Sequence, residues 1–215
     1  MVEINIGKLD KLDNIIDKEM TLELKLNCVE LSKNFNFYYH APENNDYSLE
    51  SYIDILSFNT LEEFWVLDQY IKRDMIENGM FFIMLESITP TWEDKKNLNG
   101  GCISWKVDRK NSYKFWIDTV GHFITQSLGR FTPKINGVSI SPKKNSNIIK
   151  LWFSEEIDIN IMKLPDTFML ANDKIIYKSH VQNIDKDKSK RITGNNYSGY
   201  NNSTYPTSNM GYRYN

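Results

Sequence analysis

The stretch Phe58-Asn59-Thr60-Leu61-Glu62-Glu63-Phe64-Trp65 combines a helix start with the first residues of an apolar face. Thr60 and Glu63 form a capping-box pair, in which the hydroxyl and the carboxylate each accept a hydrogen bond from a backbone amide at the helix start. Apolar residues then recur at helical spacing, at Leu61, Phe64, Leu67, Ile71 and Met75. The stretch therefore predicts a helix that starts at Thr60 and buries one side.

Short strands surround this helix in the sequence. Alternating or aromatic-rich runs predict strands at residues 21–26, 35–39, 52–55, 80–85, 103–107, 137–140, 148–153 and 174–179. A second helix is expected from about Ser112 to Leu128, with Gly129 as its stop, and Ser154 is a candidate cap for a third, short helix. Strands that follow one another directly, mixed with separated helices, predict an α+β fold with an antiparallel sheet and helices on one face.

Composition divides the chain of 215 residues into three parts. We expect residues 1–20 to form an N-terminal arm, since they are charged and carry no clear period. Residues 21–184 form the predicted domain. Residues 185–215 are rich in Asn, Tyr and Ser with almost nothing aliphatic, and such a tail cannot bury enough apolar surface to offset the entropy of ordering.

The net charge of −2 at pH 7 provides no general basic field for a nucleic-acid backbone. Any contact with nucleic acid must therefore be local. No run of 18 apolar residues and no secretory signal is found, so we expect a cytoplasmic protein without a membrane partner. The two cysteines, Cys28 and Cys102, fit no zinc spacing, and we expect neither a metal nor a cofactor.

Signals of catalysis are weak. The sequence has no Gly-rich phosphate loop, no GxSxG motif and no paired histidines. Cys102 follows Gly100-Gly101 and can be imagined as a nucleophile, but a small apolar residue entering a strand is the favoured interpretation. We therefore expect a binding protein with no catalytic residues.

The strongest site signal is Pro90-Thr91-Trp92-Glu93-Asp94, followed by Gly100-Gly101. An indole in a loop can stack on a nucleobase. The neighbouring carboxylate can accept hydrogen bonds from the N–H donors on the edge of guanine. Alone, such a triplet is weak evidence, because half-buried structural tryptophans are common.

Together with its surroundings, this motif resembles the translation initiation factor 4E family. The matching stretches are collinear from residue 35 to 180: residues 58–65, 90–97 with Gly100-Gly101, 115–119, Gly137-Val138 with Trp152, and 177–180. The resemblance implies a curved antiparallel sheet of about eight strands with three helices on its convex face. It also implies binding of the 7-methylguanosine cap of mRNA on the concave face. Methylation at N7 makes the base cationic, which strengthens its attraction to ring faces.

Under this resemblance, Trp92 matches one stacking residue, Glu93 the guanine-reading acid, and Trp152 the tryptophan that contacts the N7 methyl group. The second stacking tryptophan is missing. Counting along the chain from the two sides of the loop gives Tyr47 or Ser48, and we choose Tyr47 because a ring is needed.

Tyr52 is the second candidate for that ring. Because tyrosine stacks less strongly than tryptophan, we expect cap binding that is weaker, or differently selective, than is usual in the family.

The phosphate pocket also departs from the family pattern. Lys143 matches the first triphosphate contact, and Lys144 lies beside it. The other basic positions of the family are occupied by Cys102, Asn145 and Ile148. A solvated turn is the alternative interpretation of the two lysines.

A second surface is expected on the back of the sheet. Leu61 and Trp65 lie at i and i+4, so they project from the same side of the first helix. The resemblance implies that this side binds a helical peptide of a 4G-like scaffold or of a repressor, and Ile117 and Asp118 match the rest of that patch. Gly121 stands where a leucine is expected. A core aromatic is the alternative for Trp65.

Four functions remain to be compared. An active cap-binding initiation factor is favoured, because Trp92, Glu93, Trp152 and Lys143 are all present. A cap-binding repressor or decoy would lack the scaffold contact, as Gly121 suggests. A protein-interaction module would keep the fold without the cap. An enzyme such as a cap hydrolase would need a metal-binding carboxylate cluster, which Glu93 and Asp94 alone do not supply.

Overall fold

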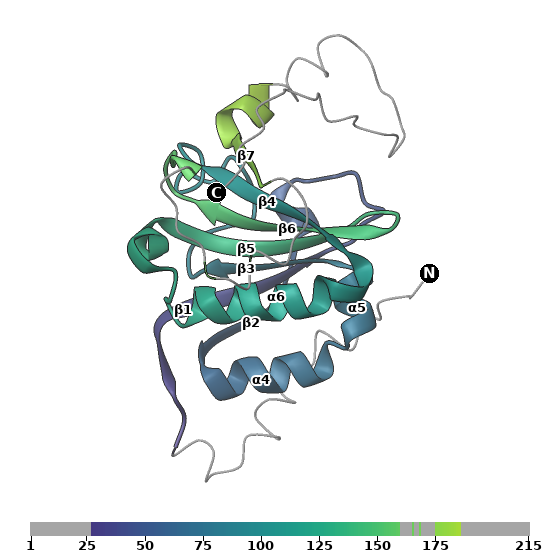
Figure 1. Ribbon diagram of the computed structural model, residues 1–215, viewed down its shortest axis with the longest axis vertical. Coiled ribbons are helices and arrows are strands. Elements are labelled where there is room, and N and C mark those ends of the chain that lie inside the picture. The colour runs from purple at the N-terminus through teal and green to yellow at the C-terminus, as the bar shows by residue number, and fades with distance from the viewer. Residues whose placement is uncertain (1–26, 160–164, 166–167, 169–174, 186–215) are drawn as a thin grey trace, which may run out of the picture.

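The computed structural model describes residues 27–159, 165, 168 and 175–185. Within them the chain forms a curved seven-stranded sheet in which all paired neighbours are antiparallel, in the order β2-β1-β3-β5-β6-β4-β7 (Figure 1). The strands are β1 (Glu30–His40), β2 (Ile53–Thr60), β3 (Met80–Leu85), β4 (Gly101–Asp108), β5 (Ile135–Pro142), β6 (Ser146–Phe153) and β7 (Ile176–Ser179).

The predicted α+β class and antiparallel sheet are confirmed. The strand expected at 21–26, the arm 1–20 and the tail from residue 186 lie outside the described residues.

The capping box at Thr60 is confirmed. The Glu63 amide donates to Thr60 Oγ1 at 3.2 Å, and the Thr60 amide donates to Glu63 Oε2 at 3.0 Å. The predicted single helix is, however, two: α4 (Leu61–Tyr70) and α5 (Arg73–Asn78). Ile71 has φ −88° and ψ 87°, which is not helical. The apolar spacing continues across this break because both helices bury their side chains in the same core.

The second helix, α6 (Arg109–Ile124), starts and ends earlier than predicted. Gln126, at φ 56°, takes the left-handed conformation just after it. Gly129, at φ 61°, therefore does not stop α6 but begins the 3-10 helix η2 (Gly129–Lys134). A shorter 3-10 helix, η1 (Leu49–Ser51), precedes β2. Residues 154–158 are not helical, so no helix starts directly at Ser154, and residues 160–164 lie outside the described part.

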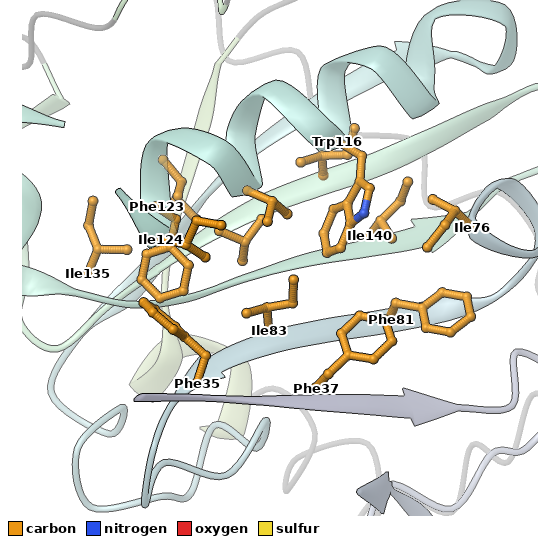
Figure 2. Close-up of a cluster of buried hydrophobic side chains, with 14 of the residues drawn as sticks. Phe35, Phe37, Ile76, Phe81, Ile83, Trp116, Phe123, Ile124, Ile135 and Ile140 are labelled. Carbon is orange, nitrogen blue, oxygen red and sulfur yellow. The ribbon is translucent and has the colours of Figure 1, made fainter. Parts of the chain in front are cut away.

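One face of the sheet packs against the helices (Figure 1). Alternate residues of the strands point into this layer, among them Phe37, Phe81, Ile83 and Ile140, and α6 contributes Trp116 and Phe123 (Figure 2). Burying each such side chain is worth roughly 1.5–3 kcal/mol. This core fixes the curvature and register of the strands, and so positions the residues of the other face.

The other face carries a second, smaller cluster, which we call the aromatic face. Its buried members are Tyr38, Phe82, Met84, Ile88, Cys102 and Trp152, and Tyr52, Met80, Leu85 and Trp92 pack against them partly buried. Register explains the grouping, because Tyr38 pairs with Phe82, and Gly137 lies between Met84 and Trp152. A Cβ atom at Gly137 would collide with the backbone carbonyl oxygen of Ile83 as well as with the Met84 side chain, so glycine is favoured there.

No helix in the described part of the chain is both long and apolar enough to cross a membrane.

Candidate functional site

The loop that carries Trp92 is held by the carboxylate of Asp94. Asp94 Oδ2 accepts hydrogen bonds from the amide and the hydroxyl of Thr89, each at 2.8 Å, and Oδ1 accepts from the amide of Lys96 at 2.8 Å. Partial burial acts to raise the pKa of Asp94, but these hydrogen bonds outweigh it, and the net pKa is lowered. Asp94 is therefore ionised at neutral pH and organises the loop.

The buried amide of Asn97 joins the two ends of the same loop. Its Nδ2 donates to the carbonyls of Thr89 at 3.0 Å and Thr91 at 2.8 Å. Asn136 of β5 then donates to Asn97 Oδ1 at 2.9 Å and to the Lys96 carbonyl at 2.7 Å. The loop is thus fastened to the sheet before any ligand arrives.

This scaffold gives the two predicted residues different surroundings. Trp92 packs partly buried against the aromatic face. Glu93 is exposed, and its negative charge adds to burial in raising the pKa of the Tyr52 hydroxyl above its ordinary value. Glu93 therefore lies close enough to Tyr52 to share one polar environment at the edge of the aromatic face.

Trp152 lies in the floor of the aromatic face and is 2% exposed. Its Nε1 donates to Ser139 Oγ at 2.9 Å. Its ring packs edge-on against Phe82, with centroids 6.2 Å apart, and stacks on His180 at 5.1 Å. The structure thus brings Trp92 and Trp152 into one cluster, with Trp152 held rigidly beneath.

The two candidate tyrosines both contact His40, the last residue of β1. Tyr47 lies parallel to the His40 ring, with centroids 4.7 Å apart and 2° between planes. Tyr52 contacts the same imidazole at 4.8 Å and packs edge-on against Phe82 at 5.4 Å. Tyr47 is 46% exposed, while Tyr52 is partly buried. A series of touching rings therefore leads from Tyr47 across the sheet to Trp152.

The predicted phosphate contacts lie in the turn between β5 and β6. Lys143 and Lys144 are exposed there, and the Lys143 amide donates to the Ser146 carbonyl at 2.8 Å. Arg109 begins α6 and donates to the Lys143 carbonyl at 3.0 Å. Arg109 therefore supports the turn from behind.

Lys150 is the cation that the sequence reasoning missed. It is the one residue of β6 that is not buried, and it lies two residues before Trp152 on the same side of the strand. It pairs with Ser139 and Ser104 of the neighbouring strands. Strand alternation from Trp152 was the signal that would have found it.

The charge of Lys150 is felt by its neighbours. The pKa of Lys143 is lowered first by partial burial and then by the positive charge of Lys150, because a nearby cation disfavours the protonated form. Two lysines thus lie near one another, and no described carboxylate forms an ion pair with Lys150. Such an arrangement can receive an anion.

Two buried side chains beside Trp152, those of His180 and Cys102, are uncharged at neutral pH. Burial, and then the charge of Lys150, lower the pKa of His180 to about 4, and burial raises the pKa of Cys102 to about 12. Sγ of Cys102 and Nε2 of His180 are 3.8 Å apart. The favoured interpretation of Cys102 as a small buried strand residue is confirmed. The described residues contain no group of three or more potential metal ligands.

The predicted back surface combines α4 and α6. Trp65 is 46% exposed on α4, and Leu61 is partly buried beside the core. Tyr113 of α6 donates to both oxygens of Asp68 of α4 at 2.9 Å, which joins the two helices. The alternative of a core position for Trp65 does not hold.

The other two residues of this surface, Ile117 and Asp118, are partly buried on α6. Asp118 accepts from Lys114 Nζ at 2.6 Å in an i,i+4 ion pair. A Cβ atom at Gly121 would have no neighbour within 4 Å, so the surface is open where a leucine was expected.

Comparisons with known proteins agree on one family. A family model described as eukaryotic initiation factor 4E matches residues 30–195. The chain is 28% identical over 127 residues to eukaryotic translation initiation factor 4E of Saccharomyces cerevisiae, covering 55% of this chain and 60% of the yeast protein. It is 30% identical over 142 residues to isoform 4E-2 of Zea mays, covering 63% and 62%. The chain therefore spans less than two thirds of the length of either relative.

Among solved structures, the fold is similar to that of C. elegans eIF4E-3 in its complex with the 4E-binding protein Mextli and cap analog. The TM-score is 0.64 at 19% sequence identity, over 76% of this chain and 96% of the nematode chain. At that identity the likeness shows the fold alone.

Proposed function

Because the chain belongs to the eukaryotic initiation factor 4E family, we propose that it binds the 7-methylguanosine cap of mRNA and acts in the initiation of translation. The observation that carries the proposal is the fastened loop, which holds Trp92 on the aromatic face and leaves Glu93 exposed beside it. The cytoplasm, where translation begins, is the compartment that this function implies. The proposal involves no catalytic step.

The chemistry follows from a cationic, flat ligand. The methylated guanine stacks between Trp92 and Tyr47, and each base–ring contact contributes roughly 1–3 kcal/mol. The positive charge strengthens both contacts, because ring faces are electron-rich. Glu93 accepts hydrogen bonds from the guanine edge, which selects guanine over the other bases. Trp152 closes the floor beneath the N7 methyl group.

The 5′-phosphates lie toward the lysines. Lys143 and Lys144 supply the contacts in the turn, and Lys150 adds a charge closer to Trp152. His180, which stacks on Trp152, is uncharged at neutral pH because its pKa is lowered to about 4, so it adds no positive charge beneath the cationic base.

The back surface is the proposed contact for a 4G-like scaffold. Trp65 is exposed there, and an exposed tryptophan is a frequent anchor of protein interfaces. Leu61, Ile117 and Asp118 complete the patch. The open position at Gly121 favours a second candidate, a cap-binding repressor or decoy that does not recruit the scaffold. A 4E-like interaction module that does not bind the cap is the third.

Calorimetric titration with 7-methylguanosine triphosphate, and with GTP as control, tests the cap site. We expect the methylated ligand to bind more tightly, and Trp92→Ala and Tyr47→Ala each to weaken it at least tenfold, a loss of roughly 1.4 kcal/mol. Trp65→Ala, on the back surface, is the control that keeps wild-type affinity. Equal binding of the two nucleotides by the wild type would refute the proposal. Loss in Trp92→Ala but not in Tyr47→Ala would move the second ring to Tyr52.

A further inference from the structure

Tyr47 does not stand alone on the surface. Its ring is stacked on the imidazole of His40 at 4.7 Å with 2° between planes, which is close to perfectly parallel. The outer partner, Tyr47, is 46% exposed, whereas His40 is 0% exposed. One ring of this pair is therefore part of the protein interior, and the other is offered to solvent.

His40 is held from two further directions. Its Nε2 donates to the carbonyl of Asp46 at 2.7 Å, since a carbonyl can only accept. The Tyr52 ring contacts it at 4.8 Å and is itself braced edge-on by Phe82. The imidazole plane is thus fixed by one hydrogen bond and by two ring contacts.

The backbone on both sides of Tyr47 is fixed as well. Asp46 Oδ1 accepts from the Ser48 amide at 2.9 Å, and Oδ2 accepts from the Ser48 hydroxyl at 3.0 Å. The Asp46 amide donates to Asn44 Oδ1 at 2.9 Å, and the Asn44 amide donates to the Ala41 carbonyl at 3.0 Å. These turns fix the backbone on both sides of Tyr47, so its ring can move only by rotation about the side-chain bonds.

We propose that His40 is a positioning residue that backs the Tyr47 ring, so that the base stacks on the outer face of a preassembled histidine–tyrosine pair. The inference rests on the proposed cap site and deepens it. A tyrosine offers a smaller face than a tryptophan, and a mobile ring would lose further affinity when it is ordered by the ligand. Stacking on a buried imidazole avoids the affinity that is lost when a ligand has to order a mobile ring, because the Tyr47 ring is already ordered in the free protein.

Two substitutions separate the ring of His40 from its hydrogen bond. His40→Gln keeps a donor that can reach the Asp46 carbonyl but removes the ring, and we expect the dissociation constant for 7-methylguanosine triphosphate to rise about three- to tenfold. His40→Phe keeps a ring but no donor, and we expect affinity within about twofold of the wild type. An equal loss in both variants would overturn the inference, since the hydrogen bond or packing in general would then be responsible.

A double-mutant cycle excludes a general structural effect. In a Tyr47→Ala background, His40→Gln should cause no further loss, because the ring that it backs is gone. Tighter binding by His40→Gln alone would overturn the inference in another way, since it would show that His40 shields Tyr47 from the base.

NMR of the wild-type protein tests the same stack without relying on the folding of any variant. Because the two rings are stacked, we expect the ring current of Tyr47 to shift the ring protons of His40 upfield in the NMR spectrum, and we expect that shift to persist at saturation with the cap analogue. Its disappearance would show that Tyr47 leaves His40 to bind. Failure of the cap proposal itself looks different, because the wild type would then not prefer the methylated nucleotide over GTP.

Discussion

Replacing Asp94 by asparagine tests whether the Trp92 loop is preassembled. The carboxylate accepts three hydrogen bonds, two from Thr89 at Oδ2 and one from Lys96 at Oδ1. An amide has one oxygen. In the better orientation that oxygen keeps both Thr89 donors, and the new NH2 group faces the Lys96 amide, donor against donor.

The least disruptive outcome is therefore the loss of one charge-assisted bond and the weakening of two others. A hydrogen bond to a charged group contributes roughly 1.5–3 kcal/mol, and partial exposure of Asp94 reduces this to about 1–2 kcal/mol. That energy corresponds to roughly a 5- to 30-fold increase in the population of the open loop. The same loss lowers the free energy of global unfolding by at most that amount, so the melting temperature should fall by only about 2–8 °C.

Amide hydrogen exchange measures this opening directly. We expect protection of the Thr89 and Lys96 amides to fall about 5- to 30-fold in Asp94→Asn, while strand amides such as that of Ile83 stay unchanged. Thr89→Val is the matched control without a change of charge, and it should produce a smaller fall in the same direction. Unchanged protection at Lys96, or an equal loss throughout the sheet, would refute the reasoning.

The same carboxylate gives the loop a pH dependence of known sign. Its pKa is lower in the folded protein than the usual 3.8, so its stabilisation is complete above that value. As the pH falls through the lowered pKa, the stabilisation is lost, and exchange at Lys96 should approach that of Asp94→Asn.

Three further outcomes are expected. Lys150→Met should weaken binding of 7-methylguanosine triphosphate roughly 5- to 30-fold in calorimetry but change binding of 7-methylguanosine, which has no phosphates, less than about twofold. Lys110→Gln on α6 is the control that removes a lysine elsewhere, and equal losses for both ligands in Lys150→Met would contradict a phosphate contact. Because the pKa of His180 is lowered to about 4, the unfolded state binds more protons below pH 6.5, so urea unfolding of the wild type should lose roughly 2–3 kcal/mol between pH 6.5 and 4. His180→Phe should lack most of that decline, and an unchanged slope would assign it to other groups. Trp65→Ala should weaken binding of a 4E-binding helical peptide at least tenfold, a change of roughly 1.4 kcal/mol, without affecting the cap, and unchanged peptide affinity in fluorescence polarisation would place the scaffold contact elsewhere.

Local signals in the sequence predicted the parts of the fold that local chemistry determines. The capping box of Thr60 and Glu63 is such a signal, because both partners lie within one helical turn. The break at Ile71 is not, since apolar spacing reports burial and both helices bury their residues in the same core. The prediction that α6 ends at Gly129 was wrong for a similar reason, because a glycine at positive φ fits equally well in the turn that follows a helix.

At the site, the sequence indicated which residues lie in the loop but not what supports them. Asp94 and Asn97 could be recognised only from their hydrogen bonds. Lys150 was missed because positions were compared one by one with a family pattern instead of by strand face, on which it shares a side with Trp152. His40 had no signal at all, since its role arises from a stack between residues whose contact depends on the turns at Asn44 and Asp46.

The order of strands in the sheet has a consequence for synthesis on the ribosome. Strand β4 is made before β6 and β7, yet these are its only neighbours in the described sheet, so it waits unpaired while the ribosome adds roughly 5–20 residues per second. During those seconds Cys102 and Trp105 lack the neighbouring strands with which they pair in the folded sheet. A nascent chain that ends before Ser146 already contains Trp92, Glu93 and both tyrosines. Of the buried members of the aromatic face, it lacks only Trp152.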